Sequence, residues 1–255
     1  MNMKILVIGA TGLIGRNVTS KLVNAGHHVI AGSRSTGIDI ITGEGLPEAL
    51  EGTEVVIDLS NSTSPEDELS NNFFRTAGQN LARMEKAAGV KHHLILSIVG
   101  TDLGQHIGYL RAKKVQEDLI KESGIPYTII RATQFHEHIT TLIAVQSQDK
   151  EVHISTVDYQ PIAAEDVAAF IAATALEAPV NSTIDIAGPE RASMTAFVER
   201  YLAITGEDKV LVPNDDNKYM FFDIEKSGLV PAGDFVSGKI SFDEWIENNI
   251  QHLHP

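Results

Sequence analysis

The stretch Gly9–Gly15, with the sequence Gly-Ala-Thr-Gly-Leu-Ile-Gly, sets the expected fold class of the chain. It follows directly after the apolar run Ile5–Ile8, whose length and composition are typical of a buried strand. After it, Ile14, Val18 and Leu22 recur at intervals of four residues, which predicts a helix with one apolar face. The stretch is therefore predicted to be the turn that joins a first strand to a first helix.

The three glycines of this turn have the spacing of a dinucleotide-binding site. Gly9 permits a tight turn, Gly12 lets the main chain approach a pyrophosphate, and Gly15 lets the helix lie close to the strand. The N–H groups at the start of the helix then point toward the phosphates. A plain glycine-rich turn is the alternative. We expect the cofactor to be bound by Gly9, Thr11, Gly12, Leu13, Ile14 and Gly15.

Strand-like and helix-like segments alternate along most of the chain. Short β-branched runs predict strands at residues 28–31, 54–59, 93–98 and 127–131. Apolar periodicity predicts helices at residues 13–25, 67–88, 108–122 and 134–146, with a further helix at 163–176 and a strand at 183–186. This alternation predicts an α/β fold with a Rossmann-type, doubly wound parallel sheet.

No linker-like break in composition separates the two halves of the chain, so we expect one NAD(P)-binding domain over residues 1–255. Its cofactor half is expected at about residues 1–131. A small C-terminal substrate lobe is expected to be built mainly from about residues 134–160 and 187–255.

Composition excludes several classes of function. The chain has 255 residues, a formal net charge of −14 and no cysteine. The negative charge repels a nucleic-acid backbone, and the absence of cysteine excludes disulfides and thiol nucleophiles. The first apolar run is too short for a signal peptide, and the sequence has no apolar run long enough to span a membrane. We therefore expect a cytoplasmic protein that binds neither nucleic acid nor membranes directly.

The end of the second predicted strand indicates which dinucleotide is bound. Sites that prefer NAD place an acidic residue there to bind the ribose 2′-hydroxyl, whereas this chain has Ser33 and Arg34. A guanidinium beside hydroxyl groups suits a 2′-phosphate. The alternative is an exposed surface arginine. The sequence thus favours NADP(H) over NAD(H).

Several motifs together resemble the short-chain dehydrogenase/reductase superfamily, and more narrowly its atypical branch of NmrA-like and NAD(P)H-binding proteins. Besides Gly9–Gly15, they are the pair Asp39-Ile40, Leu96–Gly100, Tyr109–Lys113, the strand that ends in Arg131, and Ala164–Ala168. Two departures matter. Extended members usually continue with Arg-Pro-Gly where this chain has Arg131-Ala132-Thr133, and many atypical members lack the tyrosine that this chain keeps.

The resemblance implies a catalytic role for Ser97, Tyr109 and Lys113. Tyr109 would donate a proton to a carbonyl oxygen, Lys113 would lower the pKa of Tyr109 and bind the nicotinamide ribose, and Ser97 would hold the oxygen. In the structural alternative, Tyr109 packs at a helix start, Lys113 pairs with Glu117 at the surface, and Ser97 is a buried strand hydroxyl.

The remaining candidates lie near the cofactor or the substrate. The resemblance places Asp39 and Ile40 at the end of a third strand on the adenine side, and Ser60 and Asn61 after a fourth strand beside the adenine-side ribose. The residues after the sixth strand that are expected to line the substrate pocket, with the neighbouring His136 as a further candidate, are Gln134, Phe135 and His138. The paired histidines lack the spacing of metal ligands, so no metal site is expected.

These features predict an NADP(H)-dependent oxidoreductase that transfers hydride to or from a small carbonyl or alcohol. The main alternative is a non-catalytic redox sensor of the NmrA type that acts through a protein partner, and a sugar-nucleotide epimerase is a further enzymatic alternative. The helices at residues 67–88 and 108–122 allow a homodimer.

Overall fold

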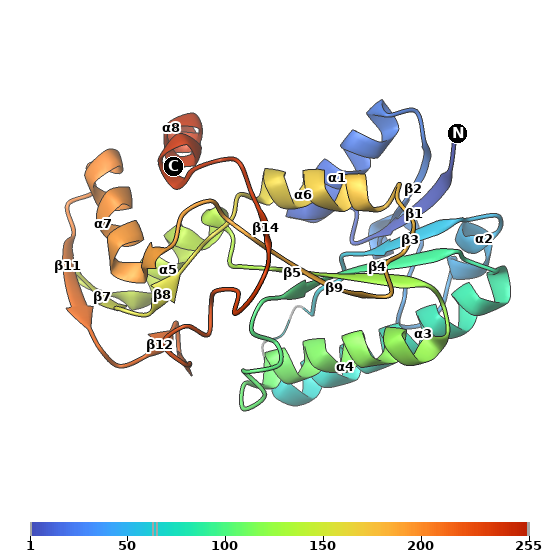
Figure 1. The fold of residues 1–255 in the computed structure, drawn as a ribbon, viewed down its shortest axis with the longest axis horizontal. Coiled ribbons are helices and arrows are strands. Elements are labelled where there is room, and N and C mark those ends of the chain that lie inside the picture. Colours follow the sequence, from blue (N-terminus) through green and yellow to red (C-terminus); the bar gives the residue numbers. More distant parts are fainter. Residues whose placement is uncertain (1, 63, 65, 254–255) are drawn as a thin grey trace. The chain divides into compact units, whose positions relative to one another are not determined.

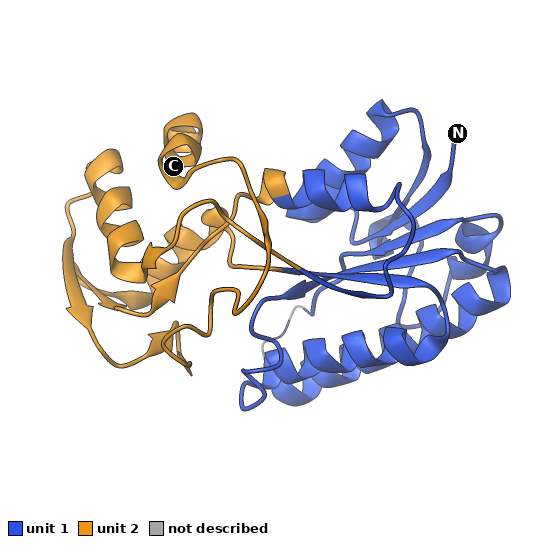
Figure 2. Cartoon of the chain, viewed as in Figure 1, with its two compact units in different colours: residues 1–131, 167–184 blue, residues 132–166, 185–255 orange. Residues whose placement is uncertain are grey.

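The computed structural model describes residues 2–62, 64 and 66–253. They form two compact units, Met1–Arg131 with Val167–Ile184 and Ala132–Asp166 with Asp185–Pro255 (Figure 2). The chain therefore passes between the units three times.

A seven-stranded sheet confirms the predicted Rossmann-type α/β fold (Figure 1). Its strand order is β14-β9-β5-β4-β3-β1-β2, and the pairs β2-β1, β1-β3, β3-β4 and β9-β14 are parallel. The strands are β1 Lys4–Ile8, β2 His28–Gly32, β3 Val55–Asp58, β4 His92–Ile98, β5 Tyr127–Ala132, β9 Ser182–Ala187 and β14 Val236–Ser237. Strands β1 and β3 are buried almost throughout, which explains their continuous apolar sequences.

Helices cover both faces of the sheet in the first unit. They are α1 Leu13–Asn24, α2 Leu46–Leu50, α3 Asp67–Ala88, α4 Gly108–Ser123 and α6 Ala164–Thr174, with a short 3₁₀ turn η1 at Arg34–Thr36. Helices α3 and α4 lie side by side on one face, and α1 and α6 lie on the other (Figure 1). The predicted apolar stripe of α1, formed by Ile14, Val18 and Leu22, is buried. Helix α3 begins with two acidic residues and ends at Gly89, whose φ of 74° suits a helix C-terminus.

The expected third strand near Asp39 is wrong. Residues 38–45 form turns between β2 and α2, in which the Asp39 N–H donates to the carbonyl of Glu44 at 2.9 Å and the Gly43 N–H donates to the carbonyl of Asp39 at 2.8 Å. Gly37, Gly43 and Gly45 all have positive φ, and these glycines fold the segment back on itself. The strand before Ser60, which was expected to be the fourth, is therefore β3. Strand β2 lies at the edge of the sheet.

The sheet reverses its strand order at β1, which has β2 on one side and β3 on the other. The carboxyl ends of β1 and β3 carry the turn Gly9–Gly15 and the residues Leu59–Asn61. In open α/β sheets, ligands bind at the carboxyl ends of the strands at such a point. The fold thus places the predicted cofactor turn where a ligand is expected.

The second unit has its own apolar core around Tyr159, Phe197, Phe242 and Trp245. Its elements are η2 His136–His138, α5 Ile139–Gln146, β6 Ser147–Gln148, β7 Glu151–Ser155, β8 Asp158–Tyr159, β10 Ala192–Ser193, α7 Met194–Thr205, β11 Val210–Asn214, β12 Lys218–Tyr219, β13 Phe222–Asp223 and α8 Phe242–Leu253.

The helix predicted at residues 134–146 begins later than expected. Phe135 forms a parallel bridge with Ile162, and the carbonyl of Gln134 accepts the N–H of Ile162 at 2.9 Å. The first residues of the segment are therefore held in extended pairing, and the regular helix α5 starts only at Ile139. Among the helices of the described residues, none is both long enough and apolar enough to cross a membrane.

Candidate functional site

The turn after β1 approaches its neighbours so closely that only glycine fits at two positions. Gly9 has a φ of 76°, and a Cβ atom there would lie 2.6 Å from the carbonyl oxygen of Leu59. A Cβ atom on Gly15 would lie inside the van der Waals distance of the Gly9 carbonyl oxygen. The turn, the start of α1 and the end of β3 are thus in direct backbone contact. This is the close packing that the glycine spacing predicts.

The N-terminus of α1 is suited to an anion. Gly12 is the N-cap residue, no side chain caps the helix, and its first turn has no acidic residue. The first N–H groups of a helix have no partner within the helix, so they can donate to a phosphate. Beside the turn, the Ser60 hydroxyl is buried without a hydrogen-bond partner among the residues described. These features fit the pyrophosphate and ribose of a dinucleotide.

The residues after β2 present one guanidinium among several hydroxyls. Arg34 is exposed and lies in η1, and its guanidinium pairs with no other side chain in the described part of the chain. The Ser33 hydroxyl lies 2.8 Å from the Ser35 hydroxyl, and the Thr36 hydroxyl accepts the Ser33 N–H at 2.9 Å. These potential donors lie together at the carboxyl end of β2, and their binding of a 2′-phosphate stays a prediction.

Asp39 and Ile40 have structural roles in their loop. The Asp39 carboxylate accepts the N–H groups of Ile41 at 2.7 Å and Thr42 at 3.3 Å, and Ile40 is buried. Asn80 on α3 donates to the carbonyls of Ile40 and Ile41 at 3.0 and 2.8 Å. Contact of Asp39 and Ile40 with a cofactor stays a prediction, and the loop that carries them is fixed by α3.

Tyr109 in the first turn of α4 reaches the end of β3. Its phenol donates a hydrogen bond of 2.5 Å to the side-chain oxygen of Asn61, and its ring meets the ring of Phe74 edge-on. Burial raises the pKa of Tyr109 to about 12, and the hydrogen bond to Asn61 offsets this effect of burial only in part. The phenol therefore keeps its proton at neutral pH. The structure brings Tyr109 and Asn61, predicted separately, into contact.

Lys113 lies one turn further along α4 and is only 3% exposed. Its ammonium donates to the carbonyl of Leu96 at 2.8 Å and to Gln116, and it lies 4.7 Å from the centre of the Phe74 ring. Burial lowers the pKa of Lys113 to about 8, with attraction from Asp58 and Glu117 acting in the opposite direction. The surface pair of Lys113 with Glu117 is therefore excluded.

The expected lowering of the Tyr109 pKa by Lys113 is not what the structure shows. Burial has the largest effect on the phenol, and it raises the pKa. The ammonium of Lys113 is directed to Leu96 and Gln116, and the two side chains share only their contact with the Phe74 ring.

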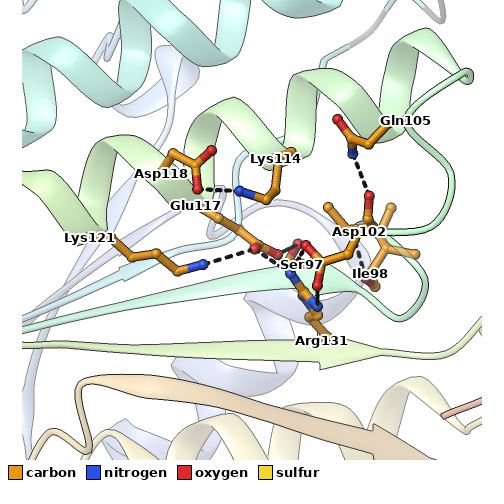
Figure 3. A network of polar contacts seen from close by, with 10 residues as sticks. Ser97, Ile98, Asp102, Gln105, Lys114, Glu117, Asp118, Lys121 and Arg131 are labelled. Carbon is orange, nitrogen blue, oxygen red and sulfur yellow. Dashed lines mark hydrogen bonds and ion pairs between the residues drawn. The ribbon is translucent and has the colours of Figure 1, made fainter. Parts of the chain in front are cut away.

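Ser97 belongs to a separate polar network, shown in Figure 3. Its hydroxyl is buried and donates to Glu117 at 2.6 Å. Glu117 also accepts from Arg131 on β5, at 2.9 Å from Nε and 2.6 Å from Nη2. The described contacts do not join Ser97 to Tyr109, so its expected role in holding a substrate oxygen lacks support here. For Ser97, the structural alternative of a buried strand hydroxyl agrees with the structure.

The sequence did not indicate that the carboxylates beside α4 are buried or which residues they bind. Glu117 is fully buried among Ser97, Lys121 and Arg131, and Asp58 accepts a hydrogen bond of 2.7 Å from Gln116. A partial signal existed, since Lys113, Glu117 and Lys121 recur at intervals of four on one helix. The pattern did not indicate Arg131 as the partner, because that residue reaches Glu117 only through the pairing of the strands.

The expected substrate-lining residues lie in the second unit. The Gln134 side-chain oxygen is buried without a partner among described residues, and the rings of Phe135 and His138 lie 5.3 Å apart. His136 is buried between Phe242 and Trp245 and is a core residue. The pocket assignment of Gln134, Phe135 and His138 stays a prediction. Within the described ranges, no group of three or more His, Asp or Glu side chains gathers as metal ligands.

Comparison with solved structures agrees with the fold. A dTDP-4-dehydrorhamnose reductase of Clostridium acetobutylicum superposes with a TM-score of 0.78 at 17% identity, covering 99% of this chain and 100% of that one. At this identity the likeness concerns the fold alone.

Two curated relatives extend the comparison to sequence. The photosystem II assembly factor Ycf39 of a Synechocystis species is 24% identical over 81% of this chain and 69% of its own length. A (4-alkanoyl-5-oxo-2,5-dihydrofuran-3-yl)methyl phosphate reductase of Streptomyces griseus is 28% identical over 65% of this chain and 62% of its own length.

A family model described as NAD(P)H-binding matches residues 9–178, which is more than half of the chain. The match begins at the glycine turn and includes Tyr109 and Lys113 on α4. It shows that the chain belongs to the NAD(P)H-binding family.

Proposed function

We propose that the protein is an oxidoreductase that uses NADPH to reduce a small carbonyl substrate. The observation that carries the proposal is the position of Tyr109, whose protonated phenol is hydrogen-bonded to Asn61 beside the end of β3. The same strand end contacts the glycine turn through Leu59 and Gly9. A proton donor is thus linked through a few residues to the expected cofactor turn.

Each part of the site has a role in this reaction. When bound, the nicotinamide nucleotide supplies the hydride. The first N–H groups of α1 hold the pyrophosphate, and Arg34 with Ser33 binds the 2′-phosphate, which is why we propose NADP(H) over NAD(H). Lys113 places a buried positive charge beside the Phe74 ring, where it favours an anionic oxygen.

The protonated phenol of Tyr109 is the form that the reduction of a carbonyl group needs. At neutral pH its phenol stays protonated, so it can donate a proton to the oxygen of a carbonyl group as hydride arrives at the carbon. The reverse reaction needs the phenolate as a base, and burial disfavours that form. We therefore propose that Tyr109 is the proton donor and that the substrate is a small molecule with a carbonyl group.

A second candidate function is a nucleotide sensor that acts through a protein partner. Two observations favour it. The hydroxyl of Ser97 donates to Glu117, and one relative is named as an assembly factor. A sensor needs the glycine turn and Arg34 but has no need of the phenolic proton.

Turnover separates the two candidates. The purified protein is mixed with NADPH and a panel of aldehydes, ketones and quinones, and NADPH oxidation is followed by absorbance. We expect turnover with at least one carbonyl, and its loss in Tyr109→Phe. Tight NADPH binding without turnover on any of these compounds would instead favour the sensor.

A further inference from the structure

Arg131 at the end of β5 binds two carboxylates along two edges of one guanidinium (Figure 3). Its inner edge donates through Nε and Nη2 to Glu117, at 2.9 and 2.6 Å. Its outer edge donates through Nη1 and Nη2 to Asp102, at 2.5 and 2.9 Å. Both pairs are bidentate, the geometry in which arginine recognises a carboxylate most strongly.

The two carboxylates are held very differently. The Glu117 side chain is 0% exposed and also accepts from Ser97, so it is fixed within the protein. The Asp102 side chain is 55% exposed and lies on the loop between β4 and α4. Because Glu117 makes its own bidentate pair with Arg131, Asp102 can leave the outer edge while that pair still holds the arginine.

The surrounding charge favours an anion at the position of the Asp102 carboxylate. The charges of Glu117 and Arg131 neutralise each other, and the Lys121 ammonium lies 3.5 Å from a carboxylate oxygen of Glu117. The pKa of Asp102 is lowered mainly by its hydrogen bonds with Arg131, with further attraction from Lys114 and Lys121. Arg131, Lys114 and Lys121 thus attract an anion at this point, although Glu117 and Asp118 pair with the same three cations.

We infer that the outer edge of the Arg131 guanidinium is a binding site for a ligand carboxylate, and that Asp102 is an internal occupant which the ligand displaces. An incoming carboxylate makes the same two hydrogen bonds and restores the same charge balance. The site lies at the carboxyl end of β5 and is joined through Glu117 to Ser97 on β4. Resting on the proposed reductase function, the inference names the substrate class: carbonyl compounds that also bear a carboxylate.

In the alternative, the ion pair of Asp102 with Arg131 only fastens the loop between β4 and α4 to β5. Ligand binding distinguishes this structural role from a binding site. Malonate is the probe, titrated by calorimetry into the full chain without nucleotide at constant ionic strength. In Asp102→Asn the competing negative charge is removed, so the Kd for malonate should fall by about tenfold or more relative to the unmodified protein. The matched control is Asp208→Asn, which removes an equal charge from the exposed pair with Lys150 and should leave the Kd unchanged.

The site must also depend on Arg131. Replacing Arg131 alone leaves Glu117 buried without its main partner, so that variant is expected to fold poorly. The combined change Glu117→Gln with Arg131→Gln in the Asp102→Asn background removes the charged pair together. It should keep a cooperative thermal transition and lose malonate binding. Equal malonate affinity in the unmodified protein, Asp102→Asn and Asp208→Asn would overturn the inference, as would tighter binding of inorganic phosphate than of malonate.

Turnover tests the link to the proposed reaction separately. Butanal and 4-oxobutanoate have the same chain length and differ by the carboxylate. Asp102→Asn should lower the KM for 4-oxobutanoate by about tenfold and leave the KM for butanal unchanged. If malonate binds as expected and neither aldehyde nor any ketone is reduced, the carboxylate site stands and the reductase function fails. If carbonyls are reduced and malonate affinity is the same in all variants, the reductase function stands and the carboxylate site fails.

Discussion

The phenolic oxygen of Tyr109 lies 2.5 Å from the side-chain oxygen of Asn61, which joins the first turn of α4 to the segment after β3. The hydrogen bond has two consequences. It fixes the direction of the phenolic proton, and it counteracts in part the burial that raises the Tyr109 pKa to about 12. A residue expected to touch the cofactor ribose thereby positions the expected proton donor.

Substituting Tyr109 by Phe should separate chemistry from cofactor binding. The variant keeps the ring against Phe74 and loses the phenolic hydroxyl, and with it the hydrogen bond to Asn61. Loss of a general acid typically costs about 10² to 10⁴ in rate, so kcat should fall by that factor while the Kd for NADPH stays the same. Steady-state kinetics and fluorescence titration measure the two quantities. Tyr127→Phe on β5 is the control, and unchanged kcat in Tyr109→Phe would remove Tyr109 from the mechanism.

Substituting Arg34 by Ala should reduce discrimination between the two nicotinamide nucleotides. We expect the unmodified protein to bind NADPH more tightly than NADH, and the variant to narrow the difference in binding free energy by about 1 to 3 kcal/mol, the contribution of a charge-assisted hydrogen bond. Calorimetry with each nucleotide measures this difference. Arg83→Ala on α3 removes an exposed arginine and should leave the difference unchanged. Equal affinity of the unmodified protein for NADPH and NADH would contradict the assignment.

Substituting Gly15 by Ala should damage the cofactor turn. The added methyl group would overlap the Gly9 carbonyl, which is backbone and can move only if β1 and α1 separate. We expect a loss of about 1 to 3 kcal/mol in stability and a large rise in the Kd for NADPH. Gly233→Ala is the control, because a Cβ atom there meets nothing within 4 Å. Thermal unfolding and nucleotide titration give the result, and normal NADPH affinity in Gly15→Ala would argue against a cofactor at this turn.

Acid should destabilise the protein between pH 6.5 and pH 4 through His136 and His92, two buried histidines whose pKa values are lowered. His136 is 1% exposed, and burial lowers its pKa to about 4. The folded state keeps the imidazole neutral while the unfolded chain takes up a proton near pH 6.5, so this stabilisation is complete above pH 6.5 and is lost as the pH falls toward 4. The full contribution is about 3 kcal/mol. His92 acts in the same direction.

The measurement is the midpoint of thermal unfolding between pH 7.5 and pH 4. His136→Phe keeps an aromatic ring between Phe242 and Trp245 and removes the proton acceptor, so its midpoint should depend less on pH. His28→Gln changes an exposed histidine and should retain the pH dependence of the unmodified protein. An identical pH dependence in His136→Phe would show that this histidine has no part in the acid sensitivity.

Chelators should affect neither nucleotide binding nor turnover. The described histidines and carboxylates do not gather into a set of metal ligands, and Tyr109 can assist a carbonyl oxygen without a metal ion. Elemental analysis after dialysis against EDTA, together with the NADPH affinity, tests this expectation. One tightly bound metal ion per chain, or activity lost with EDTA and restored by a divalent cation, would contradict it.

Local patterns in the sequence predicted the parts of the fold that depend on neighbouring residues. The glycine turn, the apolar stripe of α1, and the placement of Tyr109 and Lys113 four residues apart on one helix follow from chain geometry alone. The strand expected near Asp39 failed because three glycines with positive φ close that segment into turns. A few apolar residues in so short a segment are compatible with either a strand or turns.

The polar partners of α4 depend on contacts across the sheet, which the sequence does not reveal. Glu117 has lysines four residues before and after it, yet its main partner is Arg131, a residue of β5. That choice follows from the strand order, which places β4 and β5 side by side in the sheet that α4 covers. For the same reason the hydroxyl of Ser97 could be placed at the correct end of its strand but not assigned its acceptor.

The turns that replace a third strand leave β2 at the edge of the sheet, with Ser33 and Arg34 at its end. An edge strand has hydrogen-bonded neighbours on one side only, so changes at its end disturb few other contacts. On the proposed function, the preference for NADP(H) over NAD(H) is therefore determined at a position where substitutions cost little stability. Replacing Arg34 and its neighbouring hydroxyl residues by an acidic residue is a short evolutionary route from NADP(H) to NAD(H) as the preferred nucleotide. The same replacement is accessible to engineering.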